Sequence, residues 1–439
     1  MRRNLFRAAL LALVLGSAAV AASAQVTGLF YKEVEKEGRV YVFNTPETLK
    51  LWEESGDMGK SITLVGRGQN GETVVAENET AADLYFFRHN LDGYDRPTPK
   101  PATPAFTVGW KDGKTSIESK SAKLDISNRV QIRWTNEMPE VGDDRGSFRI
   151  RRAKTKFEGW VYSKDLSYEL QLNWPDTANP LEDVNVNYDF TKGKKTFQLK
   201  AGQFKVPFGR QELASSGSQQ FVDRSIASGE FARGRDIGVQ FWGQPAGGKF
   251  DWRFGIFNGN GRTVSRNDND KYQINARATW QPFGDVKYSE GDFESTTKPL
   301  FALSGQYESN DRHGATTADD VDREIVGGDV VFKYKGFSAF AEIFQASNDR
   351  EIAADFDSEG LIAQVGYFVI PKRLELAVRL SEIDPDTDRD NNERTETGFA
   401  IGYFFNKHPH KLQADFREIE NKATKITDKE IRLQYQIIF

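Results

Sequence analysis

Apolar and polar side chains alternate along the last eleven residues, Lys429 to Phe439. The apolar parity holds Ile431, Leu433, Tyr435, Ile437 and Phe439, and the other parity holds Arg432, Gln434 and Gln436. Successive strand side chains point to opposite faces, so this strand has one apolar and one polar face. In an outer-membrane β-barrel such faces meet lipid and a water-filled lumen. A soluble sandwich can also end on such a strand, so the number of repeats decides between the two folds.

The alternation recurs from residue 124 to the end of the chain. In Tyr272–Trp280, for example, Gln273, Asn275, Arg277 and Thr279 take the polar side. We expect sixteen antiparallel strands, at 124–134, 148–162, 166–174, 184–190, 196–204, 235–242, 249–257, 271–281, 299–307, 325–335, 337–344, 360–369, 372–383, 396–405, 409–420 and 427–439. The predicted fold class is all-β, a 16-stranded transmembrane β-barrel with an open aqueous channel.

The predicted connections alternate between short turns and longer loops, as in outer-membrane barrels. An even strand number places both ends of residues 124–439 on the periplasmic side. The exception is 282–298, a long connection where a short turn is expected. This stretch is either an elaborated turn or a slip in the predicted register.

The first 123 residues divide into three parts. Residues 1–24 have a basic start, an apolar centre and Ala22-Ser23-Ala24, which together predict a secretory signal peptide. Residues 25–95 predict a small periplasmic α/β domain, and residues 96–123 a Pro-rich linker and lead-in. Within the domain the expected strands are 39–43, 61–65 and 72–75, and the expected helices are 46–54 and 80–89. Asn44 or Thr45 is expected to cap the first helix and Asn78 the second.

Charge and composition exclude several classes of protein. No apolar run after the signal approaches the roughly 18 residues of a spanning helix, so any membrane span is expected to be β. Without residues 1–24 the chain has 56 basic and 64 acidic residues, which argues against a nucleic-acid partner. It has no cysteine. We expect no cofactor, no metal and no enzyme activity.

Two regions concentrate basic residues. Phe148–Lys156 reads FRIRRAKTK, and a bulge near Arg152 is expected to flip its parity. The segment 205–234 is the longest interruption between strands, in the third loop position, where porins fold a loop into the lumen. Arginine binds oxyanions bidentately, and basic side chains on a pore wall favour anions. The candidate substrate-binding residues are Arg149, Arg151, Arg152, Lys154, Lys205, Arg210, Arg224, Arg233 and Arg235. For the basic run at 148–156, the alternative interpretation is that its side chains contact lipopolysaccharide phosphates or pair with luminal acids. For the segment 205–234, the alternative is an exposed surface loop.

Five short motifs occur in order along the barrel region. They are Arg151–Ala153, Gly202–Arg210 (GQFKVPFGR), Phe221–Arg224 (FVDR), Gly234–Val239 (GRDIGV) and Trp280–Gly284 (WQPFG). With them the chain resembles the phosphate-selective porin O and P family over about residues 120–439. The resemblance implies a 16-stranded, trimeric outer-membrane porin with an Arg- and Lys-lined path for phosphate or related small anions.

Other functions remain open from the sequence. One is a general diffusion porin without strict anion selectivity, and another is a structural or adhesin barrel. Asp384–Asp390 resembles a calcium loop but has Arg389 where Gly is required, and the scattered histidines lack a convincing Ser partner for hydrolysis. The expected partners are small anions, outer-membrane lipid and lipopolysaccharide, further copies of the chain in a homotrimer, and the barrel-assembly machinery through Phe439.

Overall fold

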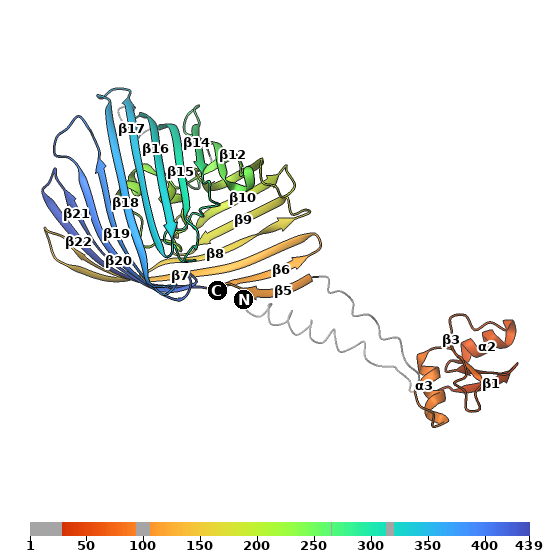
Figure 1. Ribbon diagram of the computed structural model, residues 1–439. Helices are drawn as coiled ribbons and strands as arrows, with labels where there is room; N and C mark the ends of the chain where they lie inside the picture. Colours follow the sequence, from red (N-terminus) through yellow and green to blue (C-terminus); the bar gives the residue numbers. More distant parts are fainter. Residues whose placement is uncertain (1–28, 94–105, 265, 313–319) are drawn as a thin grey trace, which may run out of the picture. The chain divides into compact units, whose positions relative to one another are not determined.

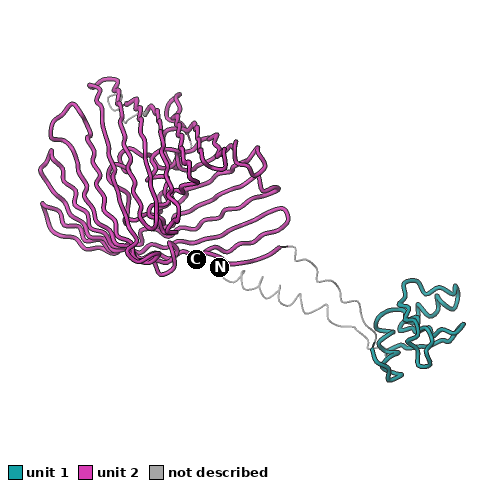
Figure 2. Tube along the Cα trace, in the orientation of Figure 1, with its two compact units in different colours: residues 1–103 teal, residues 104–439 magenta. Residues whose placement is uncertain are grey.

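The computed structural model describes residues 29–93, 106–264, 266–312 and 320–439. The expected signal peptide and the Pro-rich stretch 96–105 lie outside these residues. The chain forms two compact units, residues 1–103 and 104–439 (Figure 2). No helix among the described residues is long and apolar enough to cross a membrane.

The first unit is a small α/β sandwich. Its elements are β1 (Lys32–Lys36), β2 (Arg39–Phe43), α2 (Pro46–Ser55), β3 (Ile62–Leu64), β4 (Thr73–Ala76) and α3 (Glu79–Arg88). The sheet order is β1-β2-β4-β3, with β2 parallel to β4. Both predicted helices and the three predicted strands are present, and β1 is an additional strand that the charged sequence KEVEK concealed.

Alternate residues of the sheet pack against the two helices. Val40 and Val42 lie in one apolar cluster with α3, whereas Phe43 packs with Trp52 of α2 in the other. Period-two alternation therefore places the helices on opposite faces. Asn78 caps α3 by accepting from Ala81 N, as expected.

The two residues that lead into α2 are held by a distant side chain. Thr45 occupies the expected N-cap position, but its own side chain makes no capping bond. Instead the Glu77 carboxylate accepts from Asn44 N at 2.8 Å and Thr45 N at 3.0 Å. Burial raises the pKa of Glu77, but hydrogen bonds from Thr45 and Thr48 outweigh it and hold that pKa below its ordinary value. A carboxylate at a helix N-terminus is also favoured by the helix dipole.

The second unit is a closed antiparallel barrel of sixteen strands (Figure 1). The strands are β7 (Ala122–Met138), β8 (Arg145–Val161), β9 (Leu166–Asn173), β10 (Leu181–Asp189), β11 (Gln198–Lys205), β12 (Arg235–Gly243), β13 (Phe250–Phe257), β14 (Gln273–Trp280), β15 (Leu300–Arg312), β16 (Val321–Tyr334), β17 (Phe337–Arg350), β18 (Phe356–Ile370), β19 (Leu374–Asp384), β20 (Arg394–Asn406), β21 (His410–Asn421) and β22 (Ile426–Ile438). Pairing of β22 with β7 closes the cylinder. Each predicted strand corresponds to one of these, so the predicted fold class is confirmed.

The last strand shows the two faces that its sequence predicts. Leu433 and Tyr435 are 42% and 36% exposed on the outside, whereas Gln434 and Gln436 are buried inside. The same outward apolar pattern on the other strands gives the cylinder a lipid-facing band.

A bulge shifts the parity of β8, as the sequence predicts. Gln131 of β7 pairs with Arg152, and Ile132 pairs with Ile150, so Arg151 is the extra residue. Beyond the bulge, Arg152, Lys154 and Lys156 share the inward face. The shift therefore turns a run of basic residues into the lumen.

A hairpin precedes the first barrel strand. It consists of β5 (Phe106–Lys111) and β6 (Lys114–Ser119), and β6 pairs with residues 123–126 of β7. The sequence pattern predicts no strand in this lead-in. Val108 pairs with Ile117, which pairs with Leu124, so these apolar side chains continue the outward face of β7.

The connections distinguish the two ends of the barrel. Short turns such as 162–165 and 335–336 define the turn end, and the longer connections define the loop end. Two long segments run inside instead. They are the luminal loop, residues 206–234 with α4 (Arg210–Leu213) and α5 (Ile226–Phe231), and the luminal turn, residues 281–299. The green helices of the luminal loop lie within the cylinder in Figure 1. The register is intact around 281–299, so this connection is an elaborated turn.

A charge placed in the middle of the outward face should destabilise the barrel in a bilayer. Outward apolar residues of β18 extend from Leu361 to Val369, with Val365 at the centre. Val365→Arg should lower the free energy of unfolding by about 2–4 kcal/mol, because the guanidinium is placed in hydrocarbon. Urea unfolding from phospholipid vesicles measures this value. The control Glu359→Arg, on the same face nearer the loop end, should cost at most about 1 kcal/mol; equal costs would contradict a lipid-facing band.

Candidate functional site

Carboxylates of the barrel wall hold the backbone of the luminal loop. Inside a barrel, a loop backbone without hydrogen-bond partners would be costly. The acceptors and their distances are Glu342 with Arg210 N at 2.6 Å, Asp415 with Val222 N at 2.9 Å, and Glu396 with Ile226 N at 2.8 Å. Glu290 of the luminal turn accepts from Gln220 N at 2.7 Å. These acids are therefore engaged in positioning the loop.

Cationic and amide side chains hold the loop carbonyls in the same way. The donors are Lys411 to Gln219 O, Gln413 to Gln219 O and Gln220 O, Arg133 to Val222 O, Arg379 to Asp223 O, and Gln436 to Gly217 O. Apolar contacts add to these bonds. Phe231 stacks on Phe344 with ring centroids 5.1 Å apart, and Arg379 lies over the ring of Phe221 at 3.9 Å. The loop is thus fixed against the wall formed by β17–β22 and the adjoining β7.

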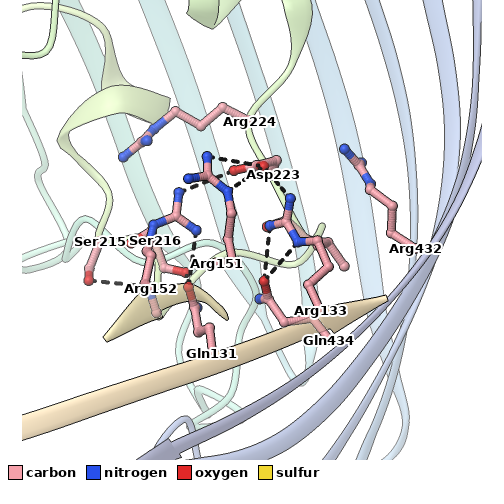
Figure 3. A network of polar contacts seen from close by, with 12 residues as sticks. Gln131, Arg133, Arg151, Arg152, Ser215, Ser216, Asp223, Arg224, Arg432 and Gln434 are labelled. Carbon is pink, nitrogen blue, oxygen red and sulfur yellow. Dashed lines mark hydrogen bonds and ion pairs between the residues drawn. The ribbon is translucent and has the colours of Figure 1, made fainter. Parts of the chain in front are cut away.

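Asp223 extends these contacts along the wall to β7, which pairs with β22, and to β8 (Figure 3). Its carboxylate lies 2.7 Å from Arg133, 3.2 Å from Arg152 and 3.4 Å from Arg151. Burial raises the pKa of Asp223, but the three guanidinium groups outweigh it and hold that pKa well below its usual range. One negative charge therefore faces three positive charges, and the cluster keeps a positive excess.

The luminal turn contributes Tyr288. Three guanidinium groups lie near its ring, those of Arg210 at 4.9 Å, Arg253 at 5.0 Å and Arg277 at 5.8 Å. Arg277 Nε also donates to the phenol oxygen at 3.2 Å. Glu290 N donates to Ser218 O at 3.0 Å, so the luminal turn and the luminal loop form one connected body.

A cavity of about 430 Å³ remains between this body and the wall of β7–β13. We name it the cationic cavity. Its basic lining residues are Arg129, Arg151, Arg152, Lys154, Lys156, Lys200, Lys205, Arg224, Arg235, Arg253 and Arg262, and its acidic ones are Glu169, Asp176, Glu182 and Asp183. Eleven basic side chains thus face four acidic ones, in a chain with more acidic than basic residues overall. Such a space attracts anions and repels cations.

Six of the nine residues predicted from the sequence lie in this cavity, namely Arg151, Arg152, Lys154, Lys205, Arg224 and Arg235. Several of these side chains form hydrogen bonds or ion pairs with other groups of the protein. Lys205 and Arg224 both donate to the Ala214 carbonyl, at 3.0 and 3.1 Å. Arg235 forms a fork on Asp183 at 3.0 and 2.7 Å, and Lys154 pairs with Glu182.

The other three predicted residues do not line the cavity. Arg149 pairs across the ladder with Arg133, so it is on the luminal face, but it is exposed. Arg210 is buried, and its guanidinium donates to Val286 O at 3.0 Å. Arg233 lies 3.8 Å from Glu308.

Five further basic residues of the cavity were not predicted as site residues, namely Arg129, Lys156, Lys200, Arg253 and Arg262. Arg129 donates to Ser215 Oγ at 3.0 Å and Ser216 Oγ at 3.2 Å. Within the described part of the chain, no carboxylate lies at ion-pair distance from Arg129 or Lys200. The inward parity of β7, β11 and β13 is the signal that could have identified Arg129, Lys200 and Arg253.

Comparison with known proteins agrees with this architecture. The family model for phosphate-selective porins O and P matches residues 125–437. The chain is 22% identical over 379 residues to an uncharacterized protein of Aquifex aeolicus (strain VF5), covering 74% of this chain and 89% of that one.

Two solved structures share the fold at low identity. The anion-selective porin from Comamonas acidovorans is 12% identical with a TM-score of 0.54, covering 72% of this chain and all of that one. The outer-membrane channel DcaP of Acinetobacter baumannii is 12% identical with a TM-score of 0.53, covering 73% and 99%.

Removing the Asp223 charge should destabilise the protein. Asp223→Asn should lower the free energy of unfolding by about 2 kcal/mol at pH 7, because three guanidinium groups lose their shared counter-charge. This is less than the roughly 3–5 kcal/mol for a fully buried pair, since the Asp223 side chain is 21% exposed. Urea unfolding measures the difference. Glu230→Gln, the same charge change at an exposed position of the loop, should have no effect.

The Asp223 contribution should also depend on pH in a defined direction. The folded pKa lies below the unfolded value of about 3.9. The stabilisation is therefore complete above about pH 4 and is lost as the pH falls toward the folded pKa. The difference between wild type and Asp223→Asn should be equal at pH 7 and pH 5; a decline within that range would contradict the assignment.

Proposed function

Since the chain belongs to the phosphate-selective porin O and P family and is an outer-membrane porin, we propose that it passes phosphate or related small anions through the cationic cavity. The observation that carries this proposal is the excess of eleven basic over four acidic side chains in the cavity. Fixed charges on a pore wall concentrate ions of the opposite sign and so set selectivity.

The separation of charges in the lumen supports anion passage in an acidic protein. Glu342, Glu396 and Asp415 are turned toward backbone amides of the luminal loop. Their charge is met by donors of the loop and by nearby guanidinium groups, such as Arg432 on Asp415 at 2.7 Å. Basic residues of β7–β13, such as Arg129, Lys156 and Lys200, line the cationic cavity instead. The solute therefore passes a basic wall, although the lumen as a whole contains both signs.

A general diffusion porin is the second candidate function. Arg235, Arg253 and Arg262 are each paired with an acid, at Asp183, Asp251 and Asp176, which reduces the field that a solute meets. In that case anions would be preferred only modestly and phosphate would not block chloride current.

The surroundings of the pore follow from the same proposal. We place the turn end on the periplasmic side, with residues 25–95 in the periplasm as a spacer or docking module.

Following the family resemblance, we expect a homotrimer. The strands β9–β14 have only eight or nine residues, and this low part of the wall is the side that we assign to subunit contacts.

Planar bilayer recordings test the proposed selectivity. Purified protein in a potassium chloride gradient should give a reversal potential of anion preference. Arg151→Glu should reduce the chloride-to-potassium permeability ratio several-fold, because one unit charge is worth about 1 kcal/mol at 4 Å even in water. Arg151 is a suitable site since it is 33% exposed and its contacts to Asp223 are long.

Arg149→Glu is the matched control, with the same charge change two residues away and outside the cationic cavity. It should alter the ratio much less. Cation preference of the wild type, or equal effects of the two variants, would overturn the proposal. Block of chloride current by millimolar phosphate would distinguish the phosphate pathway from general diffusion.

A further inference from the structure

A second cavity continues the path toward the turn end of the barrel. It has a volume of about 430 Å³, and Lys200, Glu169 and Asn185 line both cavities. We name it the vestibule. Its charges are nearly balanced, with four basic and five acidic side chains, and two of its lining residues are Trp160 and Trp242. Barrel interiors are normally polar, so tryptophan side chains directed into an aqueous path need a reason.

Trp242 is held in a fixed orientation beside cations. Its indole Nε1 donates to Asn187 Oδ1 at 2.7 Å. Lys200 Nζ lies 5.9 Å from the centroid of the indole and 5.2 Å from that of Phe204. The guanidinium of Arg253 is also 5.9 Å from the indole. The indole of Trp242, which lines the vestibule, and the charges of Lys200 and Arg253, which line the cationic cavity, are thus close together where the two cavities meet.

Lys200 differs from most cations of the lumen. Lys154, Arg235 and Arg253 each have a carboxylate partner. Lys200 has none at ion-pair distance among the described residues, and its ammonium group lies near the rings of Phe204 and Trp242 instead. A cation without a counter-ion beside an aromatic surface offers one contact for an anionic group and another for a flat ring.

We propose that the junction of the cationic cavity and the vestibule binds organic anions in which a planar ring carries the charged group, with aryl phosphates as the representative class. This inference rests on the proposed anion passage and specifies the solute. The ammonium of Lys200 and the guanidinium of Arg253 bind the phosphate, and the ring stacks on Trp242. Each cation lies 5.9 Å from the centroid of the indole. This distance suits a ligand whose charged group is attached directly to its own ring. With a longer spacer, the ligand could not contact the cations and the indole at the same time.

Block of chloride current in planar bilayers tests this site. Phenyl phosphate and methyl phosphate carry the same charge, and only the first has a ring. In the wild type, phenyl phosphate should reach half-block at about one-tenth of the concentration that methyl phosphate needs, since stacking on an aromatic side chain contributes a factor of this order. This comparison needs no variant.

Two variants locate the effect. Trp242→Leu should remove the preference for phenyl over methyl phosphate and leave the chloride-to-potassium ratio unchanged. Trp280→Leu, at an outward tryptophan that is 53% exposed, should keep the preference. Equal block by the two esters in the wild type, or a preference that survives Trp242→Leu, would overturn the proposal while anion selectivity stands. Absence of anion selectivity in the wild type would instead refute the underlying function.

Discussion

Hydrogen bonds from wall side chains to the backbone of the luminal loop determine how the lumen is organised. A loop of this length inside a barrel must find partners for its amides and carbonyls, because burial removes them from water. Here carboxylates accept from the amides of Arg210, Val222 and Ile226. Lysine, arginine and glutamine side chains donate to the carbonyls of residues 217–223. The loop is thereby fixed on one side of the lumen.

This arrangement explains how an acidic chain can line its path with cations. The carboxylates of β17–β21 are engaged by loop amides and neighbouring guanidinium groups, whereas the basic residues of β7–β13 surround the remaining space. Asp223 lies at the boundary, where one carboxylate is shared by three arginines. The net charge of the chain is therefore a poor guide to the charge that a solute meets.

Period-two alternation was sufficient to predict the barrel, because each strand reports its own two faces independently of its neighbours. The parity flip of β8 was also predictable, since Phe148 and Phe157 have opposite parity in one strand. Three other features of the structure could not be predicted from the sequence. The hairpin β5–β6 is short, and its polar residues mask the pattern. The ion-pair partners of Lys154 and Arg235 are Glu182 and Asp183 of β10, on strands that are not their neighbours along the sequence. The partner of Lys205 is Glu212 of the luminal loop. Lys200 of β11 lies beside Trp242 of β12. The linear sequence does not show that these two side chains are close.

Anomalous diffraction from crystals soaked in bromide would show whether anions gather on one side of the lumen. Bromide is a chloride analogue whose position can be located without a prior assumption about the site. Bromide peaks should lie in the cationic cavity, on the β7–β13 side near Arg151 and Lys200, and none should lie among the carboxylates of β17–β21. Peaks distributed evenly around the lumen, or a luminal loop found outside the barrel, would contradict this expectation.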